Sequence, residues 1–135
     1  MASFLTTVTE EAGLLQLLSA KTHCVLNFFA SWDEATDAGI QMVSVLEALS
    51  TRYTNMSFLK IDAEASPTLS EKYKVTVVPT FILICAGKVV TKLEGSNPPE
   101  LSKIVKTLSE IPAPKPSENE VHHFQTFLIL FYCLE

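Results

Sequence analysis

Hydrophobic and polar positions along the chain follow two spacings, and their succession predicts the fold. Apolar residues at three- and four-residue steps mark helices, and short apolar runs bounded by polar residues mark strands. The expected elements, in order, are a helix over 8–19, a strand over 24–30, a helix over 33–53, a strand over 57–61, a short helix over 67–73, a strand that follows Pro79 and ends near 84, a strand over 88–93 and a helix over 98–109. This order predicts an α/β fold with a four-stranded mixed sheet and helices on both faces.

Two residues interrupt the pattern inside expected elements. Pro79 stands in the apolar run 75–84. Because proline is not expected inside a central strand, we place it just before the strand, as a cis-proline that bends the chain. Gly39 weakens the helix over 33–53 near its start, so this segment is expected to begin as a loop or to carry a kink.

Composition divides the chain into three parts. Residues 1–110 carry the periodic pattern and are expected to form one domain with its own core. Residues 111–120, which begin Ile-Pro-Ala-Pro-Lys-Pro, are typical of a semi-rigid, solvated linker. Residues 121–135 are apolar and aromatic but too short to form a transmembrane segment. We expect a loosely packed tail there, with a membrane-touching or partner-docking segment as the alternative.

Charge and cysteine content argue against several classes of function. The chain of 135 residues has a formal net charge of −5 and lacks the basic patch that nucleic acids require. Its first residues have neither signal-peptide nor transit-peptide character, so we expect a cytoplasmic protein with the nucleus as a second location. Cys24, Cys85 and Cys133 are odd in number and widely spaced, which is not the pattern of a disulfide framework. No cluster of residues has the spacing of metal ligands.

The junction between the first central strand and the following helix is the first place to look for chemistry. Trp32 ends the apolar run, and Asp33-Glu34-Ala35-Thr36 follows. A helix N-terminus offers free N–H groups and partial positive charge. The carboxylates of Asp33, Glu34 and Asp37 are accounted for by that helix start. A metal or acid–base site is the less favoured alternative, because no further ligand completes a set.

The order of elements and three local patterns resemble thioredoxin. The patterns are Asn27-Phe28-Phe29-Ala30-Ser31-Trp32 before a helix, Val77-Val78-Pro79-Thr80-Phe81 before a hairpin, and Leu93-Glu94-Gly95 before the last helix. The likeness covers residues 4–109 and implies a thioredoxin fold. It also implies a groove between Trp32 and the cis-proline, shaped by Val78, Pro79 and Thr80, which we call the Trp32–Pro79 groove.

The resemblance also implies that the catalytic groups are missing. In thioredoxins the Trp is followed by Cys-Gly-Pro-Cys, and a buried Asp before the Trp accepts a proton. Here Asp33 stands at the position of the nucleophile, Thr36 at that of the resolving cysteine and Asn27 at that of the proton acceptor. The segment between Trp32 and Tyr53 is about three residues longer than the family's usual helix, so this pairing can shift by a few positions.

Several short stretches of the sequence are most similar to the thioredoxin-like N-terminal domains of multidomain monothiol glutaredoxins of the PICOT type. The shared stretches are Phe28 to Trp32, Asp62 to Ala65, Ser70 to Tyr73 and Val77 to Phe81. In that family a Cys-Gly-Phe-Ser motif in a further domain binds glutathione and a bridging 2Fe–2S cluster. Because this sequence has no such motif, the cofactor is implied only for a longer form, and none is expected in this chain.

Three functions remain open from the sequence. The resemblance favours a redox-inactive module that binds a protein partner through the Trp32–Pro79 groove, with Trp32 either an anchor or a packing residue. The alternative is a thiol–disulfide oxidoreductase that uses one non-standard cysteine. It needs an accessible thiolate, whereas Cys24 and Cys85 are expected to be small buried hydrophobes, and Cys133 is the most accessible thiol. The third is a scaffold linked to cytosolic iron and iron–sulfur cluster homeostasis.

Overall fold

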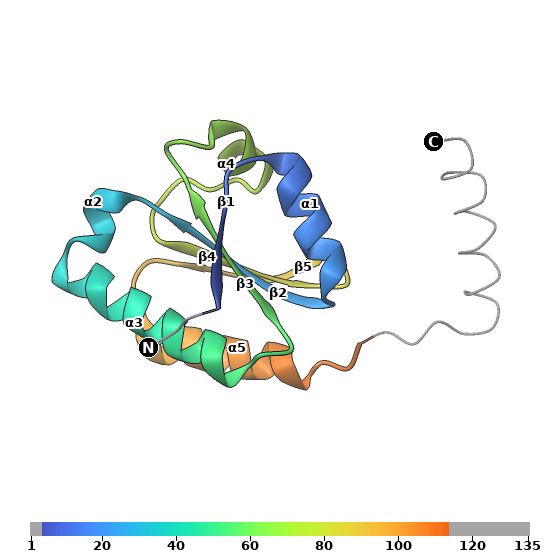
Figure 1. Ribbon diagram of the computed structural model, residues 1–135. Helices are drawn as coiled ribbons and strands as arrows, with labels where there is room; N and C mark the ends of the chain where they lie inside the picture. The colour runs from blue at the N-terminus through green and yellow to red at the C-terminus, as the bar shows by residue number, and fades with distance from the viewer. Residues whose placement is uncertain (1–3, 114–135) are drawn as a thin grey trace, which may run out of the picture.

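The computed structural model describes residues 4–113, which form one mixed sheet covered by helices on both faces (Figure 1). Most of the expected linker and all of the tail, with Cys133, lie outside the described residues. The elements are β1 (Leu5–Val8), α1 (Glu11–Ala20), β2 (His23–Phe29), α2 (Ser31–Glu34), α3 (Asp37–Arg52), β3 (Ser57–Asp62), α4 (Pro67–Lys72), β4 (Thr80–Cys85), β5 (Lys88–Glu94) and α5 (Pro98–Glu110).

The sheet is built around β2. The strand order is β1-β3-β2-β4-β5, with β3 parallel to both β1 and β2. β4 runs antiparallel to β2, and β5 runs antiparallel to β4. β2 lies in the middle of the sheet and six of its seven residues are buried, which is why its sequence is apolar without alternation. The crossover and the hairpin predicted from the sequence are both present.

Two hydrophobic clusters fill the space between the sheet and the helices. α1 and α4 cover one face, and α3 and α5 cover the other (Figure 1). Leu14 and Leu69 pack on the first face against Leu26 and Phe28 of β2. On the second face the buried residues of α3 and α5 pack against Val25, Phe58 and Phe81; they are Met42, Leu46, Leu49, Leu101, Val105 and Leu108. No helix within residues 4–113 has both the length and the apolar character to cross a bilayer.

The sheet has five strands, so the prediction of four was wrong in its strand count. The additional strand is β1, which pairs with the outer side of β3 from Leu5↔Phe58 to Val8↔Ile61. It is four residues long and buries one side chain, Val8. A strand this short at the edge of a sheet carries too few apolar positions to give an alternating pattern, so only its backbone pairing reveals it.

The helix expected over 33–53 is two helices. α2 ends at Glu34, and α3 begins at Asp37 with Thr36 as its N-cap. The interruption expected near Gly39 therefore exists, a few residues earlier. α1 begins at Glu11, not at 8, because β1 occupies residues up to Val8, and its N-cap is Glu10. The other elements agree with the predicted ranges to within about two residues, as expected for boundary assignments.

Gly39 lets α2 pack directly against the first turn of α3. It is buried, and a Cβ added there would overlap the carbonyl oxygen of Asp33 and lie 2.7 Å from the Cα of Glu34. Both atoms belong to the α2 backbone, which cannot rotate away as a flexible side chain can. The glycine that weakens helix α3 is therefore required where the two helices meet.

We expect Gly39→Ala to lower the free energy of unfolding by about 1–3 kcal/mol, because the added methyl group must force α2 away from α3. Urea denaturation followed by circular dichroism measures the change. Gly13→Ala is the matched control: Gly13 lies in α1 with nothing within 4 Å of the added Cβ. That variant should be more stable by about 0.5–1 kcal/mol, since alanine favours a helix over glycine. Equal effects of the two substitutions would contradict the proposed contact.

Candidate functional site

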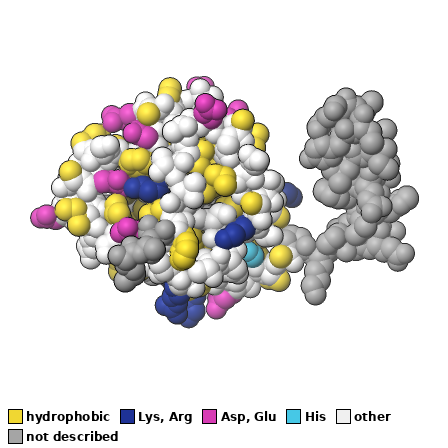
Figure 2. All heavy atoms as spheres, in the orientation of Figure 1, with side chains coloured by type: hydrophobic (Ala, Val, Ile, Leu, Met, Phe, Trp, Pro, Cys, Tyr) yellow, Lys and Arg dark blue, Asp and Glu magenta, His cyan; other side chains and the backbone are white. Residues whose placement is uncertain are grey.

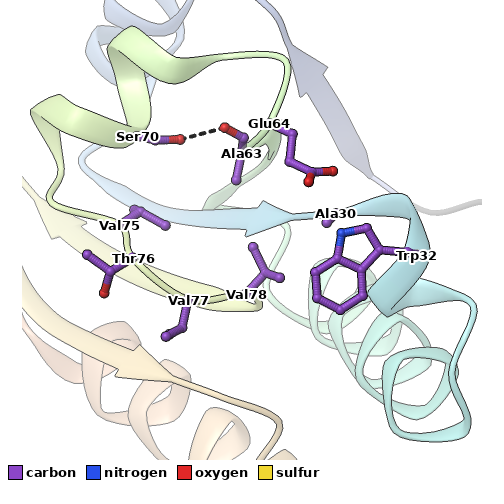
Figure 3. A pocket seen from close by; sticks show the side chains of 9 residues that line it. All are labelled: Ala30, Trp32, Ala63, Glu64, Ser70, Val75, Thr76, Val77 and Val78. Carbon is purple, nitrogen blue, oxygen red and sulfur yellow. Dashed lines mark hydrogen bonds between the residues drawn. The ribbon is translucent and has the colours of Figure 1, made fainter.

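A surface hollow of about 420 Å³ lies where β2 ends and the chain approaches Pro79. Trp32 forms one wall and Val75, Val77 and Val78 form the other (Figure 3). The remaining lining residues are Ala30, Ala63, Glu64, Ser70 and Thr76. The volume lies in the range typical of small-ligand pockets, and most of the lining side chains are apolar. The structure thus brings Trp32 and the segment before the proline together, while Pro79 and Thr80 do not line the hollow.

Trp32 is displayed to solvent by the short helix α2. Its side chain is 60% exposed, while Ala30, two residues earlier, is fully buried at the end of β2. The N–H groups of Asp33 and Glu34 both donate to the carbonyl of Ala30, which turns the chain sharply after the strand. The indole is therefore an exposed apolar surface on a fixed backbone, which is the arrangement of a contact anchor.

The other wall is fixed by the bend at Pro79. The Val78–Pro79 peptide bond is cis, and Pro79 is buried. The hydroxyl of Thr80, also buried, donates to the carbonyl of Val77 at 2.7 Å. The carbonyl of Pro79 accepts a hydrogen bond from the N–H of Gly95 at 2.8 Å. Val78 lines the hollow, whereas Thr80 supports the bend from within the core.

The position that would activate a nucleophile is occupied by Thr36. A thiolate is favoured at a helix N-terminus, and the long helix here is α3, whose N-cap is Thr36. The Thr36 hydroxyl accepts a hydrogen bond from the N–H of Gly39 and donates to the Asp33 carbonyl at 2.6 Å. A three-residue shift of the expected pairing fits this geometry. Thr36 then takes the place assigned to Asp33, and Gly39 takes the place assigned to Thr36.

Asn27 lies beneath this helix start and is sealed from solvent. Its side chain is 3% exposed and donates to the carbonyl of Phe28 at 3.4 Å. The gap that it shares with Asp33, Gly39 and Pro79 measures about 10 Å³, which is at the lower limit for a single water molecule. Asn27 is thus a neutral amide in a closely packed site.

An ion pair that the sequence did not reveal holds α2 against the sheet. Lys60 lies beside Asn27 in the register of β2 and β3. Its ammonium group lies 2.6 Å from a carboxylate oxygen of Glu34, with side chains 14% and 23% exposed. The same group lies 4.3 Å from the centroid of the Phe29 ring, within the range of a cation–π contact. The only signal in the sequence was one lysine among the apolar residues of β3, which is not specific.

The two cysteines in residues 4–113 are remote from the hollow or buried. Cys24 is fully buried, and its thiol donates to the carbonyl of Lys21 at 3.4 Å. Burial raises the pKa of the Cys24 thiol, so the protonated form is favoured. Cys85 is partly exposed and pairs with His23 at the start of β2, whereas Trp32 follows the other end of that strand. This region contains no group of three or more His, Cys, Asp or Glu side chains placed to hold a metal ion.

Comparison with known proteins agrees with this architecture. Residues 5–110 match the family model described as Thioredoxin. The chain is 37% identical over 103 residues to Glutaredoxin-3 of Mus musculus, which covers 76% of this chain and 30% of that protein. It is also 37% identical over 98 residues to Monothiol glutaredoxin-S17 of Arabidopsis thaliana, which covers 73% of this chain and 20% of that protein. The chain thus spans less than a third of the length of these relatives.

Solved structures give the same result at the level of the fold. The oxidised form of mitochondrial thioredoxin 3 from Saccharomyces cerevisiae superposes with a TM-score of 0.69 and 29% identity, over 76% of this chain and 94% of that one. The match of nearly the whole described region to one family model decides the classification. The chain belongs to the thioredoxin family, in a form similar to the thioredoxin-like region of monothiol glutaredoxins.

Proposed function

We propose that this chain is a redox-inactive thioredoxin-like module that binds a protein partner through the Trp32–Pro79 groove. The observation that carries the proposal is the exposed Trp32 on one wall of an apolar hollow, close to the start of α3 at Thr36. Trp is enriched among the residues that dominate binding energy at protein interfaces. Exposure of a large apolar ring to water is unfavourable in free energy, and contact with a partner would remove that ring from water.

The backbone of the opposite wall supports binding of an extended segment. Residues 76–78 run between α4 and β4 without regular structure, and within the described part of the chain their N–H groups make no hydrogen bond. Thr76 and Val77 are exposed. Free backbone donors beside an apolar hollow can pair with the backbone of a peptide, while the hollow accepts its side chains.

The oxidoreductase alternative is physically disfavoured for the cysteines in residues 4–113. Cys24 has no exposed surface and its pKa is raised by burial. Cys85 is aligned with the first residue of β2, six residues before its end at Phe29, which places it about 20 Å from the groove at 3.3 Å per residue. Within residues 4–113 both cysteines are free, and the two belong to hydrophobic clusters on opposite faces of the sheet.

A link to iron and iron–sulfur homeostasis is proposed only for a longer protein that contains this module. It is supported by the similarity to proteins named monothiol glutaredoxins, of which the chain spans 30% or less in the two comparisons given. In such a protein the module would recruit the partner, and a separate domain would hold the glutathione-ligated cluster. For the chain by itself we propose no cofactor and a cytoplasmic location, which suits the unpaired Cys24 and Cys85.

Trp32→Ala should abolish partner binding with little effect on stability, because the indole is mostly exposed and loss of an interface Trp costs about 2 kcal/mol or more of binding energy. The test is affinity capture from cytoplasmic extract with quantitative mass spectrometry. Val89→Ala, which removes a 54% exposed apolar side chain from β5, is the matched control and should retain the captured proteins. The groove is not the interface if both variants capture the same proteins as the original chain.

The chain should not accelerate the reduction of insulin by dithiothreitol, because neither Cys24 nor Cys85 lines the groove. A thioredoxin with a Cys-x-x-Cys pair serves as the positive control. If the chain does accelerate the reaction, the same assay is carried out on the variant in which Cys24, Cys85 and Cys133 are all changed to Ser. If the acceleration disappears with the cysteines, the oxidoreductase alternative replaces the present proposal.

The buried Cys24 thiol should make the fold less stable at alkaline pH. The pKa of this thiol is raised in the folded state. Its contribution to the free energy of unfolding is therefore complete below about pH 9, where an exposed thiol ionises. That contribution is lost as the pH rises through the pKa of the folded state. Denaturation at about pH 8 and about pH 10 should show a larger loss of unfolding free energy for the original chain than for Cys24→Ala. Burial is the main cause that raises the pKa of Tyr73, and Cys24 is the smallest one, so most of the effect of this tyrosine is common to both proteins. Equal losses of unfolding free energy in the two proteins would contradict a raised pKa of the Cys24 thiol.

A further inference from the structure

The groove carries one charged side chain, and it lies at the Trp32 end. Among the residues that line the hollow, Glu64 is the only one with a formal charge. Its carboxylate lies on the same side of the hollow as the indole of Trp32, whereas Val75 and Thr76 lie at the far side (Figure 3). Glu64 is exposed, and no ion pair to it is found in residues 4–113. A charged group of the partner can therefore reach it without first displacing another residue.

The surroundings of Glu64 make the same end strongly acidic. Asp62 is the last residue of β3 and pairs with Phe29, the last residue of β2 before the chain reaches Trp32. Asp33 and Asp37 follow Trp32 in the chain. Figure 2 shows acidic side chains gathered on the side of the molecule where α2 lies and where β3 leads into α4. The nearby cation, Lys60, is already paired with Glu34, so it does not offset the other carboxylates.

The opposite end of the groove has the other sign. Lys74 immediately precedes Val75 and is exposed. Its own backbone is in the left-handed region, with φ of 56°. The ammonium group of Lys92 donates to the carbonyl of Lys74 at 2.6 Å, which brings a second positive charge to this turn. The ammonium group of Lys92 also lies 3.7 Å from a carboxylate oxygen of Glu94. Charge thus runs from negative at Trp32 to positive before Val75, with apolar lining between.

We infer that the Trp32–Pro79 groove selects an extended protein segment in which a Lys or Arg flanks an apolar residue. The apolar side chain enters the hollow between Trp32 and Val77, and the basic side chain lies at the Trp32 end against Glu64. This inference rests on the proposed function and specifies the chemistry of its partner. It follows from charge complementarity, which steers encounter and discriminates between partners more than it adds affinity.

Selection of a random linear peptide library displayed on phage, with the full chain as bait, tests the inference. Peptides that depend on the groove are those enriched on the original chain and lost on Trp32→Ala. Among these we expect enrichment of Lys and Arg beside apolar residues. The same selection on Glu64→Gln should keep the apolar preference and lose the basic one, and Glu64→Lys should favour acidic residues instead.

Binding of one selected peptide, made without Trp, can be followed by the fluorescence of Trp32, the only Trp in the chain. We expect Glu64→Gln to weaken binding about 2- to 5-fold, as for other exposed charge pairs. Higher salt should weaken binding to the original chain more than binding to this variant. Glu110→Gln at the end of α5 is the matched control and should leave the affinity unchanged.

The outcomes separate this inference from the function on which it rests. Peptides that need Trp32 but show no basic preference would overturn the inference and leave the groove as a binding site. Failure to obtain any Trp32-dependent peptide would overturn both. Two other occupants would also overturn it: a second copy, if sedimentation shows a dimer that Trp32→Ala dissociates, or the chain itself, if a peptide of residues 111–124 competes as well as the selected ones.

Discussion

The contact between α2 and the first turn of α3 governs what this domain can do. It depends on Gly39, where the absence of a side chain lets the Asp33 carbonyl approach the long helix. Thr36 joins the two helices by hydrogen bonds to both. With α2 fixed in this way, Trp32 is turned outward beside the exposed N-cap of α3, Thr36. One steric constraint therefore fixes the short helix that displays the indole.

The charges around the site fit the proposed role in recognition. Asn27 is neutral where a proton acceptor would be needed, and the neighbouring Lys60 is held by Glu34. This ion pair is mostly buried, so removing one partner would leave a charge in an apolar setting beside Phe29. The remaining carboxylates face solvent around Trp32. None of the described residues that line the groove is a cysteine, and its walls are fixed by the core on one side and by the Pro79 bend on the other.

Much of the fold could be predicted because its central elements bury apolar side chains with a clear period. β2 and β4 gave continuous apolar runs, and α5 gave a one-sided helical pattern. β1 could not be predicted because an edge strand that buries only Val8 has almost no pattern. The division of α2 from α3 was also missed in detail, since the turn at Ala35 and Thr36 is made by contacts with Gly39 and not by local propensity.

The sequence by itself determined the thioredoxin fold, the bend at Pro79 and the absence of a cysteine pair, because these depend on residue type and order along the chain. Only the tertiary structure decided how Trp32 is oriented, which residue caps the long helix, and that Lys60 pairs with Glu34 across 26 positions of sequence. It also decided that Glu64 joins Trp32 in one groove. The reason is physical: the exposure of a side chain and the partner of a charge depend on what packs around them, and that is fixed only when distant segments meet.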